Sequence, residues 1–263
     1  MSRASLPVWQ RPAWRKAGLL LLIGLAWEVY GRVLDNDLLF PTLLQTLKSL
    51  WEAVASGVLP KRSLNSLSVL LQGYLIGTAG ALLLAALAAT TRIGADLLDM
   101  LTAVFNPLPA IALLPLALMW FGLGNASLVF VLVHSVLWPM ALNTHSGFRS
   151  VSPTLRMVGR NVGLRGARYT ALILVPAAFP SILAGLKVGW AFAWRTLIAA
   201  ELVFGVSSGS GGLGWFIYER KNQLDTGAVF AGLLTVILIG LAVEGVLFRW
   251  VEDRTVRRWG MSH

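Results

Sequence analysis

The sequence predicts an all-α protein that crosses a lipid membrane six times. Hydrophobic residues make up 56% of the 263 residues and charged residues only 13%, whereas soluble domains have roughly 45–50% apolar and about 25% charged residues. The segments 63–91 and 100–148 contain no Asp, Glu, Lys or Arg. Uncharged apolar runs longer than about 18 residues are typical of bilayer-spanning helices.

Apolar runs and helix breakers divide the chain into six predicted spans. The uncharged run after Asp99 is too long for one crossing, and Gly122, Gly124 and Asn125 supply the turn that divides it. The six spans are residues 17–34, 67–89, 100–121, 128–144, 180–204 and 226–248.

The first span resembles a signal peptide in outline, because basic residues precede its apolar run. However, Trp27, Glu28 and Tyr30 stand where a cleavage site needs small residues, so we expect the span to be retained. The predicted organisation is therefore a cytoplasmic segment (1–16), a transmembrane domain (17–250) and a cytoplasmic tail (251–263).

The distribution of Lys and Arg predicts the orientation of the spans. Fourteen of these residues fall in the terminal and even-numbered connections, against five in the opposite set of loops. Because basic residues favour cytoplasmic loops, both termini are predicted in the cytoplasm. The net charge of +10 belongs to these loops beside lipid, and we do not expect a nucleic-acid partner.

Two external connections are long enough to carry structure. Residues 41–59 place apolar side chains at helical spacing and predict an amphipathic helix at the outer interface. Residues 205–225 predict a glycine-rich flexible loop that ends in a short amphipathic piece. Its glycines do not form a nucleotide-binding loop, because no Lys-Ser or Lys-Thr pair follows them.

We find no catalytic or metal-binding constellation in the sequence. There is no cysteine, and His134 and His145 lie on one apolar span without a carboxylate beside them, which favours packing over metal binding. His263 is the last residue. The glycine pairs Gly73/Gly77 and Gly185/Gly189 predict close helix packing within one subunit rather than across a dimer.

Charged side chains within the fifth span are candidates for a translocation path. Arg195 lies ~22 Å beyond Pro180 at the rise of an α-helix, and Lys187, Trp194 and Glu201 share one stripe at intervals of seven. A polar stripe on a span faces water or a partner helix. The path candidates are Lys187, Trp190, Trp194, Arg195 and Glu201, and pairing of these charges with Glu28, Arg32 or Glu244 is the structural alternative.

The cytoplasmic loop 146–175 carries a motif. Gly163 is followed after nine residues by Ile173, Leu174, Val175 and Pro176, which is similar to the second half of E-A-A-x3-G-x9-I-x-L-P, with Val for Leu. The first half has diverged, since residues 157–159 read Met-Val-Gly. This motif occurs in permeases of binding-protein-dependent ABC importers, where it docks into the ATPase subunit.

The segments NPLPAIALLPLALMWFGLGNAS and VPAAFPSILAGLKVGWAFAWRTLIAAELVFG extend this resemblance over about residues 65–258. The chain resembles the nitrate/sulfonate/bicarbonate (taurine-type) permease family, which implies a type I importer (MetI-like) fold. The resemblance implies an inner-membrane permease for a small anion or organic acid. The residues implied to couple it to the ATPase are Ser152, Arg156, Met157, Gly159, Arg160, Gly163, Leu164 and Pro176.

The resemblance also implies the partners. They are a second copy of the permease in a homodimer, two ATP-binding subunits and an external substrate-binding protein, either periplasmic or a lipoprotein. The permease itself is expected to be no enzyme and to hold no cofactor, with ATP and Mg bound by the ATPase. The alternatives are a secondary transporter or channel driven by ion gradients, which often shows inverted repeats, and a membrane enzyme, which would need paired catalytic groups. We see neither feature.

Overall fold

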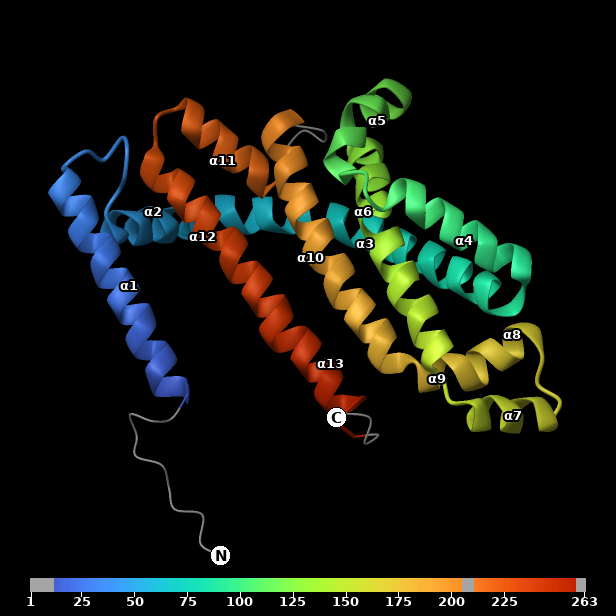
Figure 1. The fold of residues 1–263 in the computed structure, drawn as a ribbon. Helices are drawn as coiled ribbons and strands as arrows, with labels where there is room; N and C mark the ends of the chain where they lie inside the picture. The colour runs from blue at the N-terminus through green and yellow to red at the C-terminus, as the bar shows by residue number, and fades with distance from the viewer. Residues whose placement is uncertain (1–11, 205–210, 259–263) are drawn as a thin grey trace, which may run out of the picture. The chain divides into compact units, whose positions relative to one another are not determined.

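The computed structural model describes residues 12–204 and 211–258, and over these residues the secondary structure is helical without a strand. Figure 1 shows the succession of helices along the chain. They are α1 (Pro12–Leu34), α2 (Leu43–Ala55), α3 (Val58–Thr90), α4 (Arg92–Phe105), η2 (Ala110–Leu113), α5 (Leu114–Phe121), α6 (Asn125–Ser150), α7 (Pro153–Asn161), α8 (Gly166–Tyr169), η3 (Thr170–Leu174), α9 (Val175–Ala177), α10 (Phe179–Phe204), α11 (Leu213–Asn222), α12 (Thr226–Ala242), η4 (Val243–Phe248) and α13 (Arg249–Arg254).

The apolar helices match the predicted spans with one correction. Five helices are long and apolar enough to cross a membrane, and a bent pair makes six if it is counted as one span. The third predicted span, 100–121, is wrong as a continuous helix, because α4 and the segment Ala110–Phe121 meet at 85°. Pro107 and Pro109 lie at this break, where each lacks the N–H that a continuing helix needs. The predicted turn after α5 is confirmed, with Gly122 at φ 72°.

Two compact units make up the chain, one of residues 1–60 with 216–235 and one of residues 61–215 with 236–263. In the first unit, the Phe40 ring lies 6.0 Å from Trp27 and 5.5 Å from Phe230, measured between centroids. The Thr226 hydroxyl also donates to the Leu38 carbonyl at 2.9 Å. These contacts join α1, the segment after it and α12 within that unit.

Helix α2 confirms the predicted helix of segment 41–59. Thr42 caps it, because its hydroxyl accepts from the Gln45 N–H while the Gln45 side chain accepts from the Thr42 N–H. Such a reciprocal capping box satisfies two backbone donors that a helix start otherwise leaves unpaired. Its position at the outer interface stays a prediction.

The second unit is built around α6 and α10, which run side by side in Figure 1. A Cβ at Gly185 would lie 2.9 Å from the Met140 sulfur, and one at Gly77 of α3 would lie 2.9 Å from Val136. Glycine is therefore required for α3 and α10 to approach α6 this closely. The prediction that the paired glycines pack within one subunit is confirmed.

The predicted glycine-rich loop lies partly outside the described residues, at 205–210, and so do Trp259 and His263. The short piece expected at its end is helix α11.

Candidate functional site

A cavity lies where the third span is broken. It encloses about 380 Å³ and is bounded by the connection between α4 and η2, by α6 and by α10. Its lining residues are Asn106, Pro107, Leu108, Pro109, Ala110, His134, Ser135, Trp138, Pro139, Leu142, Asn143, Phe192 and Thr196. Among these, only His134 is titratable. Hydrogen-bonding groups rather than formal charges therefore make the cavity polar.

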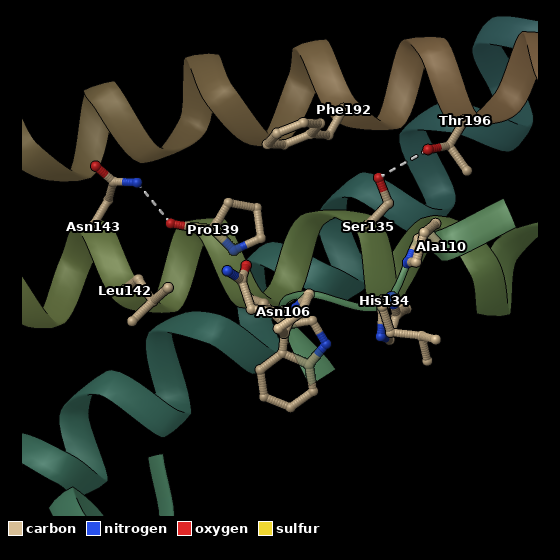
Figure 2. Close-up of a pocket in the computed structure, with 13 residues that line it drawn as sticks. Asn106, Ala110, His134, Ser135, Pro139, Leu142, Asn143, Phe192 and Thr196 are labelled. Carbon is tan, nitrogen blue, oxygen red and sulfur yellow. Dashed lines mark hydrogen bonds between the residues drawn. The ribbon is translucent and has the colours of Figure 1, made fainter. Parts of the chain in front are cut away.

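The polar groups of the cavity come from facing helices. Figure 2 shows Ser135 of α6 and Thr196 of α10 pointing toward one another, and their hydroxyl oxygens are 3.3 Å apart. The Asn143 amide donates to the Pro139 carbonyl of its own helix at 2.7 Å. The hydroxyl pair thus links α6 and α10 at the cavity wall.

Trp138 supplies a further donor at this wall. Its ring is buried and stacks on Phe105, with centroids 5.4 Å apart and planes 10° apart. In the part of the chain that the structure describes, the Trp138 Nε1–H has no hydrogen-bond partner. A buried donor without a partner is unfavourable, and such groups call for a functional explanation.

Arg195 of α10 does not itself line the cavity, but its guanidinium contacts a residue that does. Its side chain is exposed, and its guanidinium carbon lies 5.8 Å from the centroid of the Phe192 ring. Phe192 and Thr196, three residues before and one after it, both line the cavity. A guanidinium stays charged at physiological pH and is costly against lipid, so this face of α10 must meet water, protein or an anion.

Lys187 is ion-paired. Its ammonium lies 2.5 Å from the Glu252 carboxylate near the end of the chain, with both side chains partly exposed. Glu252 was not among the partners considered from the sequence. Glu28 instead pairs with Arg32 on its own helix at 2.7 Å.

The two tryptophans of α10 are buried in packing. The Trp190 and Trp194 rings are stacked, with centroids 6.3 Å apart and planes 6° apart. The Trp194 Nε1–H donates to the Val236 carbonyl at 3.2 Å. Trp194 therefore joins α10 to Val236 within the second unit.

Glu201 is buried at the opposite end of α10 from Lys187. Its carboxylate accepts from the Ser66 hydroxyl at 2.8 Å and from the Gly214 N–H at 2.8 Å. Ser66 in turn accepts from the Leu213 N–H at 2.8 Å. The carboxylate thus binds the N-terminus of α11, where negative charge is favoured. None of the five path candidates lines the cavity itself, and Arg195 contacts the lining residue Phe192.

The segment predicted to dock on the ATPase begins with a well-defined helix. Ser152 caps α7, its hydroxyl accepting from the Leu155 N–H at 3.4 Å, and Pro153 occupies the first turn. Helix α7 ends at Asn161, and Gly163 in the turn that follows has φ 79°. The N–H groups of Gly163 and Leu164 donate to the carbonyls of Arg160 and Gly159 at 3.0 and 3.1 Å, in a Schellman motif.

Gly159 and Arg156 attach α7 to the rest of the second unit. A Cβ at Gly159 would lie 2.9 Å from Ile173 and 3.1 Å from the Tyr169 ring. The Arg156 guanidinium donates to the carbonyls of Phe148 and Val151 at the end of α6. The Phe148 carbonyl also accepts from the Val151 N–H, so Arg156 adds further donors at the C-terminus of α6 and fixes α7 to it.

The outer face of α7 is apolar. Met157, Val158 and Val162 are each more than half exposed. Exposed apolar patches of this kind mark interaction surfaces. Arg160 and Leu164 line a second cavity, and Pro176 lies in the first turn of α9.

Of the residues that line the cavity, the sequence alone singles out only His134. Asn, Ser and Thr on apolar helices are common packing groups, and nothing in their spacing distinguishes them. The available signal was the run Asn106-Pro107-Leu108-Pro109. Prolines inside a span predict a break, and broken helices often border transport sites.

Several known proteins are similar to this chain in sequence or in fold. A family model described as binding-protein-dependent transport system inner membrane component matches residues 78–257. A protein of Methanocaldococcus jannaschii described as an ABC transporter permease is 30% identical over 243 residues, which are 91% of this chain and 90% of that protein. The taurine transport system permease protein of Escherichia coli is 28% identical over 240 residues, 86% of this chain and 82% of that protein.

A solved structure described as an amino acid ABC transporter with histidines shares the fold, with a TM-score of 0.58 at 17% identity over 80% of this chain and 97% of that chain. The matched family covers more than half of the chain, and the apolar helices and the shared fold agree with it. The chain therefore belongs to the inner membrane components of binding-protein-dependent transport systems and is the permease subunit of an ABC importer.

Proposed function

We propose that two copies of this permease form the passage for a small anion, such as a sulfonate. The residues around the cavity at the broken third span would line this passage. The observation that carries the proposal is the placement of Arg195 beside that cavity. The hydroxyls of Ser135 and Thr196 and the Asn106 amide can hydrogen-bond a polar head group, while Phe192 and Leu142 offer apolar contact. The Arg195 cation and these uncharged hydrogen-bond donors could together bind an anion with one negative charge and release it again.

The sulfonate class is supported by the taurine permease of Escherichia coli among the relatives. Selection of the substrate belongs mainly to the external binding protein, which delivers it to the permease. A passage with uncharged walls fits this division, because weak binding lets the substrate leave again. Nitrate and bicarbonate carry the same single negative charge as a sulfonate group and are smaller than an organic sulfonate.

Coupling is proposed to run through α7. ATP, Mg and hydrolysis belong to two partner ATPase subunits, and the exposed face of Met157, Val158 and Val162 would dock on one of them. Arg156 ties α7 to the end of α6, and α6 lines the cavity. Movement of α7 would therefore reach the cavity wall through packed helices, in the way discrete packed states switch.

The orientation completes the proposal. Both termini and the loop 146–175 face the cytoplasm, as the asymmetry of Lys and Arg favours. Segments 41–59 and 205–225 face the binding protein outside.

The test is uptake of taurine, nitrate or bicarbonate by proteoliposomes that hold the permease with its ATPase and binding protein. We expect Thr196→Val to lower uptake severalfold while binding-protein-stimulated ATP hydrolysis persists. Thr144→Val removes a buried hydroxyl from α6 outside the cavity and serves as the matched control. Equal uptake by the Thr196→Val and Thr144→Val complexes would show that the substrate passes elsewhere.

A further inference from the structure

We propose that the second cavity, between the end of α3 and the turn that joins α7 to α8, binds the phosphate of an anionic phospholipid headgroup. It encloses about 350 Å³. Its lining residues are Ala89, Thr90, Arg160, Leu164, Arg165, Gly166 and Tyr169. The site is separate from the proposed substrate passage, with which it shares no lining residue.

Two cations converge on this cavity. Arg160 lies in the last turn of α7, and Arg165 immediately precedes α8. The turn at Gly163 connects them, and both line the cavity. Neither guanidinium forms an ion pair with any residue in the described ranges, and the lining holds no carboxylate. Arginine presents a planar fork of donors that matches phosphate oxygens.

Tyr169 gives the cavity a buried donor. Only 8% of the residue is exposed, and its hydroxyl has no hydrogen-bond partner within residues 12–204 and 211–258. The ring itself is held in place, since it packs against Gly159. A buried hydroxyl of this kind is satisfied when a ligand oxygen reaches it. The Thr90 hydroxyl, by contrast, already donates to the Ala86 carbonyl at 2.9 Å.

The position of the cavity at the end of a membrane helix favours a lipid headgroup as its ligand. Ala89 and Thr90 are the last residues of α3, a 33-residue apolar helix. The cavity thus lies where a span ends and headgroups begin. Basic pockets at the cytoplasmic ends of membrane helices recognise anionic headgroups. The assignment to the cytoplasmic leaflet rests on the orientation proposed above.

The test uses the permease with its ATPase in bilayers of equal parts phosphatidylglycerol and phosphatidylcholine. The ratio of the two lipids that remain bound after extraction is measured by mass spectrometry. We expect phosphatidylglycerol to be enriched, and the double variant Arg160→Gln/Arg165→Gln to lower the enrichment by about thirtyfold, since each of the two basic residues near a headgroup contributes about 1 kcal/mol. Tyr169→Phe keeps the ring and should lower it by about threefold. Arg168→Gln, an exposed cation outside the lining, is the control and should leave it unchanged.

The outcomes separate the sources of the anion. Displacement of phosphatidylglycerol by added inorganic phosphate would confirm phosphate recognition and show that free phosphate also enters. Equal loss in the Arg168→Gln control would overturn the site in favour of general surface charge. No enrichment of phosphatidylglycerol would overturn the assignment to a lipid headgroup. Loss of anion uptake by the Thr196→Val complex with lipid enrichment intact concerns the passage alone.

Discussion

The Lys187 ammonium and the Glu252 carboxylate, 65 residues apart in sequence, meet at 2.5 Å and join α10 to α13. Both groups are more than a third exposed, so water weakens the attraction and the pair should contribute only about 1 kcal/mol to stability. The contact nevertheless engages Lys187 of α10 in tertiary structure.

The first prediction concerns this pair. Lys187→Gln and Glu252→Gln should each lower the melting temperature of the purified complex by about 2–4 °C, and the charge-swapped double variant should recover most of the loss. The control is Arg257→Gln, which breaks an exposed pair with Asp253 and should have less effect. Additive losses in the two single variants, without recovery on swapping, would show that Lys187 has another partner.

A second prediction concerns Arg195. Because its contact is the Phe192 ring, while Glu201 is bound by Ser66 and Gly214, Arg195→Ala should leave no buried acid unpaired. The complex should assemble and hydrolyse ATP, but uptake should fall at least tenfold. Arg195→Lys should retain part of the uptake. Poor assembly of Arg195→Ala that is rescued by Glu201→Gln would instead assign Arg195 a structural role.

The third prediction tests the turn after α7. A side chain at φ 79° costs roughly 1–2 kcal/mol, so Gly163→Val should distort the Schellman motif and weaken co-purification with the ATPase subunit. Gly163→Asn, which tolerates this backbone region, is the matched control. The coupling assignment fails if the Val variant retains and stimulates the ATPase normally.

A fourth prediction concerns the buried Glu201. A Cβ at Gly212 would overlap the Glu201 carboxylate, so Gly212→Ala should destabilise the permease by about 1–3 kcal/mol. Glu201→Gln should cost about as much, because the Gln amide cannot accept every hydrogen bond that the carboxylate accepts. Both are measured by thermal unfolding. Gly240→Ala, whose added Cβ would lie 3.6 Å from Trp194, is the tolerated control.

The fifth prediction is topological. The natural chain has no cysteine, so single cysteines can be introduced without background labelling. Cysteine at Arg156 or Arg160 should react with an impermeant thiol reagent only from the cytoplasm, and cysteine at Asn222 only from outside. Ser208 gives the same external test but lies outside the described residues. Reaction of both sets from one side would exclude the proposed orientation.

The sequence by itself determined the long apolar helices other than the third span, because uncharged apolar runs of this length are typical of bilayer-spanning helices. It also determined local geometry where one residue type is required. Gly163 follows α7 in the left-handed region, and the pair Gly185/Gly189 marks where α10 approaches α6. These features follow from backbone conformation and from side-chain size at a single position.

Only the tertiary structure decided which groups meet. Glu201 accepts a hydrogen bond from Ser66, which is 135 residues away in sequence. Lys187 forms its ion pair with Glu252 rather than with an acidic residue of α1. Helical periodicity places a residue on a face, but it does not say which helix packs there. The cavity beside Arg195 likewise exists only because the prolines bend the third span while α6 and α10 stay in contact, and that combination depends on three segments at once.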